Sequence, residues 1–313
     1  MLIDILKIVA GFVLLIGGGQ FLVKGAVEIT KYFNISKLVV GMTVVAFGTS
    51  APELLVSIQA AFKNSADIAL GNVIGSNIAN VVLVLGMSIA VLPIFVKKET
   101  VKFDWPIMMG LFAMLWLFMW DNVLTRIEGA ILFASLIAFV WWEIRYSLKN
   151  HVTDEKDEEE KKFSIPIAVL IIIAASAALA YGSDILVEGT KNLALAIGIS
   201  ERVISISVIA LGTSLPELAA SLTAAIKKES DISVGNIIGS NIFNIASILG
   251  ITSLLHPIKF NFAEFQNDLI WMTAIGFVLF LSFLPLKKRF VNRYKGIIFV
   301  AIYVLYMILL FQK

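Results

Sequence analysis

The chain has 313 residues, of which 59% are hydrophobic and only 15% are charged, and its mean hydropathy is +0.91. Soluble domains carry about 25% charged residues, so most of this chain faces an environment other than water. The net charge of +2 gives no reason to expect a nucleic-acid partner, and the absence of cysteine excludes disulfide bonds, thiolate metal sites and cysteine nucleophiles.

Long uncharged runs predict membrane-spanning helices, because crossing a hydrocarbon core of about 30 Å takes about 20 helical residues. The predicted spans in chain order are 2–30, 36–63, 67–95, 102–121, 124–148, 163–196, 200–227, 231–255, 266–286 and 291–311. A strongly polar segment, 149–162, is predicted to be a solvated linker. The expected fold is an all-α polytopic membrane protein of ten helices, divided into 1–148, the linker 149–162 and 163–313.

The distribution of lysine and arginine predicts the orientation, because basic residues near span ends prefer the cytoplasm. The loops on one side of the predicted spans carry 17 of these residues, and those on the other side carry 6. This bias predicts a multi-pass cell-membrane protein with both termini outside and the linker 149–162 in the cytoplasm.

Two sequence motifs occur twice at a common offset of 164 residues. Residues 48–54 read GTSAPEL and residues 212–218 read GTSLPEL, while residues 71–80 read GNVIGSNIAN and residues 235–244 read GNIIGSNIFN. Polar residues repeated in register within apolar sequence indicate a duplicated unit. Each unit has an odd number of predicted spans, so the second is expected to insert upside down, an arrangement typical of transporters with a midplane site.

Each unit carries one isolated carboxylate deep in a predicted span. Glu53 is the only charged residue of 38–62, and Glu217 is the only charged residue of 203–226. A charge at such depth costs about 2.5–3.5 kcal/mol even on insertion scales, and two like charges brought together repel each other. No lysine or arginine lies at comparable depth in the core spans. The balancing charge must therefore be a bound cation or protons.

The residues around the two glutamates supply oxygen atoms. Thr49 precedes Glu53 by four residues, so the two side chains share a helix face; the second unit repeats this spacing. Proline directly before each glutamate removes a backbone donor and opens the preceding turn. The next helix of each unit carries a polar stripe at intervals of four: Asn72, Ser76 and Asn80, then Asn236, Ser240 and Asn244. This all-oxygen set suits calcium, and sodium accepts similar ligands.

The paired motifs resemble the two alpha-repeats of the cation/calcium exchanger superfamily, in particular its prokaryotic sodium/calcium exchangers, over effectively the whole chain. The resemblance implies that the first and sixth helices are long and slide across an eight-helix core. It implies that Glu53 and Glu217 are the central ligands for calcium and sodium. The other ligands implied by the resemblance are Thr49, Ser50, Ser76, Asn80, Thr213, Ser214, Ser240 and Asn244, with the carbonyls of Ala46 and Ala210 serving sodium.

The predicted function is a secondary active antiporter that exchanges sodium for calcium, with no resident cofactor and no obligatory protein partner beyond the bilayer. Some members of the superfamily carry aspartate where this chain has Asn244, and the asparagine favours potassium-independent exchange. A calcium/proton exchanger would share both glutamates and stays open as an alternative. A cation channel also uses midplane carboxylates, although duplicated broken helices favour a carrier. An enzyme is disfavoured, since no histidine, cysteine or buried lysine lies near enough to activate a nucleophile.

Some repeated residues have a structural interpretation. The pairs Gly71 with Gly75 and Gly235 with Gly239 have the small-xxx-small spacing of close helix packing. Two aspartates at the predicted helix starts are interpreted as N-caps; they are Asp67 and Asp231. Asn72 and Asn236 fit interhelical hydrogen bonding and ion ligation equally well.

Overall fold

The computed structural model describes residues 1–149, 163–198, 210–284 and 290–311. Within these residues nine helical segments are long and apolar enough to cross a membrane, which agrees with the predicted polytopic all-α class. The seventh predicted span, 200–227, lies partly outside the described residues, and so does most of the predicted linker 149–162. The described part of the seventh span consists of two shorter helices, α10 (Ala210–Gly212) and α11 (Leu215–Ile226).

The elements are named in chain order, with η marking π-helical segments. The first half contains α1 (Leu2–Phe33), α2 (Lys37–Val40), η1 (Gly41–Val45), α3 (Ala46–Phe62), α4 (Ala66–Ala79), η2 (Asn80–Leu85), α5 (Gly86–Val91), β1 (Ile94–Phe95), η3 (Thr100–Asp104), α6 (Trp105–Phe118), β2 (Val123–Leu124) and α7 (Arg126–Lys149). Besides α10 and α11, the second half contains α8 (Ile165–Ala196), α12 (Ser230–Phe243), η5 (Asn244–Leu249), α13 (Gly250–Leu255), β3 (Ile258–Lys259), α14 (Phe262–Ser282), β4 (Phe290–Val291) and α15 (Arg293–Phe311).

The element bounds repeat at the offset found in the sequence. The run α4, η2, α5 and β1 recurs 164 residues later, with identical lengths, as α12, η5, α13 and β3. The short strands then join the two halves, because β1 pairs with β4 and β2 pairs with β3, both antiparallel. Each half therefore contributes one strand to each of the two described sheets.

Helices α4 and α12 form the centre of the molecule. Their spans are 78% and 89% buried, whereas the span of α1 is only 22% buried and that of α8 only 28%. The sequence explains the difference, since α4 and α12 carry small and polar residues on several faces and α1 exposes large apolar side chains. Such side chains are stable against lipid, while the polar residues of α4 and α12 need protein partners.

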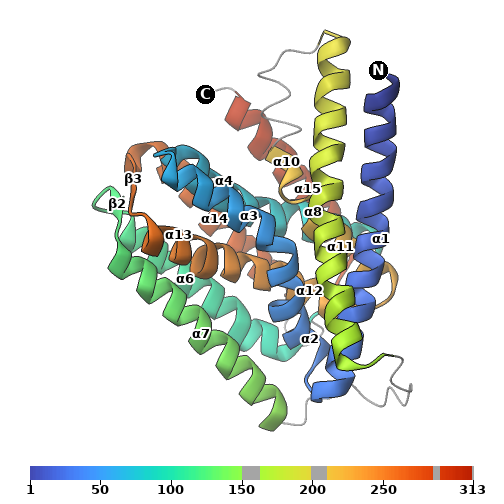
Figure 1. Cartoon of the computed structure of the whole chain (residues 1–313). Helices are drawn as coiled ribbons and strands as arrows, with labels where there is room; N and C mark the ends of the chain where they lie inside the picture. Colours follow the sequence, from blue (N-terminus) through green and yellow to red (C-terminus); the bar gives the residue numbers. More distant parts are fainter. Residues whose placement is uncertain (150–162, 199–209, 285–289, 312–313) are drawn as a thin grey trace.

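Helices α1 and α8 pack along their length as a long antiparallel pair at one side of the molecule (Figure 1). Glycines allow the close approach: a Cβ atom on Gly11 would lie 2.6 Å from the Leu186 Cβ, and one on Gly18 would lie 2.9 Å from the Leu179 side chain. An ion pair joins the two helices near one end, where the Lys7 amine lies 2.6 Å from the Glu188 carboxylate. Apart from such end contacts, the interface is apolar and built on small residues.

Two ion pairs tie the start of α12 to the first half. The Lys37 amine lies 3.0 Å from the Glu229 carboxylate, and the Lys97 amine lies 2.7 Å from the Asp231 carboxylate. The N-cap interpretation of the two repeated aspartates is wrong. Helix α12 begins at Ser230 and α4 begins at Ala66, so each aspartate is the second residue of its helix. Asp231 instead forms a cross-half ion pair, which sequence spacing alone does not reveal.

Candidate cation site

Two carboxyl groups from opposite halves of the chain meet in the protein interior. Glu53 lies within α3, and Glu217 lies in the first turn of α11; each is 1% exposed. Their carboxyl groups are close enough for the charge of one to act on the other. No lysine or arginine of the described residues forms an ion pair with either one. The N-terminus of α11 provides a partial positive charge at Glu217. Glu53 lies in the middle of α3, away from the positive end of its own helix.

The backbone around this acidic pair departs from regular α-helix. The π-helical segment η1 leads directly into α3, and η2 and η5 begin at Asn80 and Asn244. Insertions of this kind occur frequently at functional sites. The expected opening at Pro216 is visible, because α10 ends at Gly212 and the Gly212 carbonyl accepts a hydrogen bond of 2.5 Å from the Ser183 hydroxyl. Pro52, by contrast, lies inside the continuous helix α3.

Two hydroxyl groups beside Glu53 reach across to the second half. The Ser50 hydroxyl donates to the Glu217 carboxylate at 3.0 Å. The Thr49 hydroxyl lies 3.2 Å from the Asn236 side-chain oxygen and 3.3 Å from the Ala46 carbonyl oxygen. The motif of one half is thus completed by residues of the other half.

Many oxygen atoms of the predicted ligand set have no hydrogen-bond partner although they are buried. They include both carboxylate oxygens of Glu53 and one of Glu217, as well as the amide oxygens of Asn80 and Asn244. The unpartnered hydroxyls are those of Ser76, Ser214 and Ser240. An unsatisfied buried polar group costs about 1–3 kcal/mol, and native structures hold few of them. These residues lie on α3, α4, α11, α12 and the adjoining segments, which pack against one another, so unpartnered oxygens on them fit the oxygen shell of a hard cation.

The remaining predicted residues lie at the break in the seventh span. Thr213 and Ser214 connect α10 to α11, and Ser214 is 2% exposed while Thr213 is only half-buried. Ala210 is the first residue of α10, at the edge of the described segment. Ala46, its equivalent in the first half, is fully buried at the start of α3.

Asn72 and Asn236 make interhelical hydrogen bonds. The Asn72 amide nitrogen donates to the Ser57 hydroxyl at 3.0 Å, and the Asn236 amide nitrogen donates to the Ser221 hydroxyl at 2.8 Å. Both serines lie four residues after a glutamate and are 0% exposed. The sequence analysis missed these serines, although their shared offset of 164 residues was a signal that could have found them.

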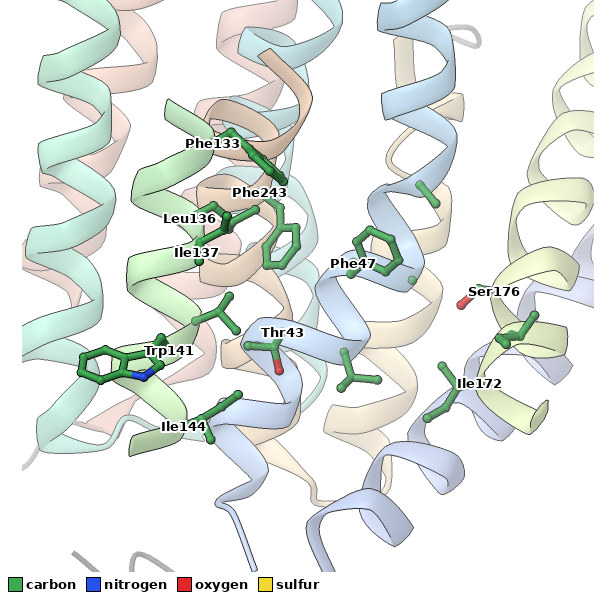
Figure 2. A pocket seen from close by; sticks show the side chains of 15 residues that line it. Thr43, Phe47, Phe133, Leu136, Ile137, Trp141, Ile144, Ile172, Ser176 and Phe243 are labelled. Carbon is green, nitrogen blue, oxygen red and sulfur yellow. The ribbon is translucent and has the colours of Figure 1, made fainter. Parts of the chain in front are cut away.

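A cavity of about 800 Å³ lies beside α3 but does not belong to this site (Figure 2). Residues of η1, α3, α7, α8 and α12 line it, and Phe47 and Phe243 lie between α3 and α7. None of the predicted ligands lines the cavity, and its walls are almost wholly apolar. Its apolar walls offer no ligands to a cation, so the cavity is not the cation site.

The donor set of the site is oxygen alone. Within the described residues no group of three or more histidine, cysteine, aspartate or glutamate side chains could hold a metal ion. The acidic pair with its neutral oxygens therefore differs from zinc or copper sites, which use nitrogen and sulfur. Its two carboxylates and surrounding hydroxyl and amide oxygens match the ligands of hard cations. Fold and site together define a polytopic membrane protein of the cation-transporter class.

Comparisons with known proteins assign the family. The chain matches the sodium/calcium exchanger protein family over residues 4–145 and 167–312, and it belongs to that family. It is 34% identical over 296 residues to the membrane protein MJ0091 of Methanocaldococcus jannaschii, with 94% of each chain covered. It is 29% identical over 348 residues to the sodium/calcium exchanger MaX1 of Methanosarcina acetivorans, with 99% of each covered.

Solved structures of the sodium-calcium exchanger NCX_Mj have the same fold. The structure soaked with zero Na⁺ and Ca²⁺ gives a TM-score of 0.84 at 30% sequence identity, covering 97% of this chain and 98% of that one. The structure soaked with 10 mM Na⁺ and zero Ca²⁺ gives a TM-score of 0.82. The resemblance predicted from the two motifs is therefore confirmed at the level of family and fold, and the chain is a multi-pass membrane protein of the antiporter class.

Proposed function

We propose that this protein exports calcium in exchange for sodium, with both ions using the site around Glu53 and Glu217. The observation that carries the proposal is the meeting of two buried carboxyls, without a basic partner, among unpartnered oxygens of both halves. Family membership supports it, as do the names of relatives such as the exchanger MaX1.

Exchange follows from competition for one set of oxygens. Two carboxylates neutralise one calcium ion or accept several sodium ions, but they do not do both at once. The empty and doubly ionised pair is unstable in the dry interior, because a buried charge without a partner is strongly disfavoured. Translocation is then effectively restricted to loaded carriers, which is the requirement for coupled exchange.

Alternating access is assigned to the long pair α1 and α8. In this proposal the two halves, 1–148 and 163–313, are inverted five-helix repeats. Each half contributes one long helix to the pair. Only a small fraction of the α1 and α8 spans is buried. Gly19 of α1 packs closely against α11, because a Cβ atom on Gly19 would lie 2.8 Å from the Ala219 carbonyl oxygen. Small residues at such a contact permit sliding across the core that holds Glu53 and Glu217. The bias of lysine and arginine between the loops supports a topology with both termini outside and the linker 149–162 in the cytoplasm.

Calcium flux into proteoliposomes, with one ion gradient imposed at a time, tests the driving ion. An outward sodium gradient is expected to drive saturable calcium uptake, and a potassium gradient alone should drive none. Calcium uptake driven by a proton gradient without sodium would assign the protein to the calcium/proton branch instead. Single-channel currents in place of saturable counterflow would indicate a channel.

Acid pH is expected to inhibit the exchange. Protonation removes the negative charge of Glu53 and Glu217 that calcium requires, so the rate should fall as the pH is lowered and recover as it is raised. The dependence should be steeper at low calcium concentration, because protons and calcium compete. Initial rates at several calcium concentrations across the pH range measure it, and a rate independent of pH at limiting calcium would contradict the shared site.

A further inference from the structure

A second pair of acidic side chains is buried away from the Glu53–Glu217 site. Asp104, the last residue of η3, is 1% exposed, and Glu143 in α7 is 3% exposed. Their carboxyl groups are close enough to act on each other. Glu143 precedes the end of α7 by six residues, about 9 Å at 1.5 Å per residue, so the pair lies near one end of its spans.

Within the described residues no basic partner neutralises this pair. Glu99 repels a negative charge at Asp104. Neither Asp104 nor Glu143 forms an ion pair with a lysine or arginine of the described chain, and Lys97 pairs with Asp231. Two adjacent buried carboxyls repel each other when both are ionised, and a proton shared between them leaves one negative charge. The remaining charge still lacks a partner.

Unpartnered oxygens point to a ligand beyond that proton. The Thr100 hydroxyl, one turn before Asp104, is 0% exposed and is directed at the Asp104 carboxyl without completing a hydrogen bond. One oxygen of each carboxyl is likewise buried without a partner. The π-helical turn of η3 links Thr100 and Asp104, and η3 is the one described π-helix that does not border the Glu53–Glu217 site.

We infer that Asp104, Glu143 and Thr100 form a second cation site that takes a calcium-class ion in place of the shared proton. The site repeats the pattern of the first one: two adjacent buried carboxyls, a buried hydroxyl and unpartnered oxygens, with no basic residue of the described chain in an ion pair with them. Binding of one divalent ion converts both carboxyls to carboxylates and releases the proton, so the charges balance. The site shares no residue with the Glu53–Glu217 set.

Terbium luminescence in the purified full-length protein tests this site. The background carries E53Q and E217Q, which removes both carboxylates of the first site. Trp105 and Trp142 adjoin Asp104 and Glu143 in the sequence, so Tb³⁺ held between the two acids is excited through tryptophan. The expected result is a luminescence signal that calcium displaces, with proton release on calcium addition, and loss of both when D104N and E143Q are added.

Matched variants make the outcome decisive. Replacing two acids elsewhere, D121N with E264Q, is expected to leave the signal unchanged. Replacing both tryptophans, W105F with W142F, keeps every ligand oxygen and is expected to abolish the sensitised signal, which locates the ion even if the acid variants fail to fold. A background protein without calcium-displaceable luminescence, or with a signal that survives the tryptophan replacements, overturns the second site. Neither result depends on whether the wild-type protein exchanges calcium for sodium.

Discussion

Replacing either central glutamate by glutamine is expected to abolish calcium exchange. Glu53→Gln and Glu217→Gln keep the shape of the side chain but remove one of the two charges that face the ion. At an effective dielectric constant of 20, a unit charge about 4 Å away is worth about 4 kcal/mol, and a divalent ion experiences twice that. Even half of one such interaction corresponds to a loss of calcium affinity of more than tenfold. Calcium flux into proteoliposomes measures the effect.

The matched control is Glu28→Gln, which neutralises an acid of similar burial outside the site. Glu28 is 3% exposed in α1 and lies 3.5 Å from the Lys31 amine. Its replacement is expected to leave much of the calcium flux, and it shows whether removing a buried acid is harmful in itself. Near-normal flux in either Glu53→Gln or Glu217→Gln would remove the basis of the proposed function.

The sequence was sufficient to locate the acidic pair because the signal was simple. A lone charge in a long apolar run stands out, and repetition at 164 residues identified Glu53 and Glu217 as equivalent positions. The same repetition predicted the recurrence of helices, since polar residues at matching positions impose matching local structure. Family and fold were predictable for these reasons.

The side-chain contacts between the two halves could not be predicted from the sequence. The bond from Ser50 to Glu217 and the approach of Thr49 to Asn236 join residues more than 160 positions apart, and the offset relates equivalent residues rather than neighbours. The seventh span also differs from the second, since Pro52 lies inside a helix whereas Pro216 follows a break. The two motifs are nearly identical and therefore did not predict that one helix is continuous and the other broken, because helix continuity also depends on packing against other elements.

The Asp104–Glu143 pair was overlooked for a related reason. Each acid lies near the end of its predicted span, where a charge ordinarily reaches the interface and needs no partner. Only the fold shows that Asp104 and Glu143 are turned inward and face each other. Depth along the sequence was therefore a good guide at the midplane and a poor one near the span ends.

Introducing a methyl group at Gly239 is expected to destabilise the protein by about 3 kcal/mol, the upper end of ordinary overpacking. A Cβ atom there would lie 2.5 Å from the Met42 carbonyl oxygen and 2.6 Å from the Met42 Cα. Gly235 meets the Leu38 carbonyl oxygen at the same 2.5 Å. Backbone atoms cannot turn aside as a flexible side chain would, so Gly239→Ala must push α12 away from η1. Thermal unfolding in detergent measures the loss.

The displacement is expected to impair transport as well as stability. Ser240 follows Gly239 directly, and Asn236 holds Thr49 through its side-chain oxygen, so movement of α12 separates ligands of the two halves. Gly110→Ala is the control, because Gly110 is exposed on α6 with no described neighbour within 4 Å and alanine suits a helix better than glycine. If Gly239→Ala unfolded at the wild-type temperature with full calcium flux, the tight contact between α12 and η1 would not be needed for stability or for the proposed site.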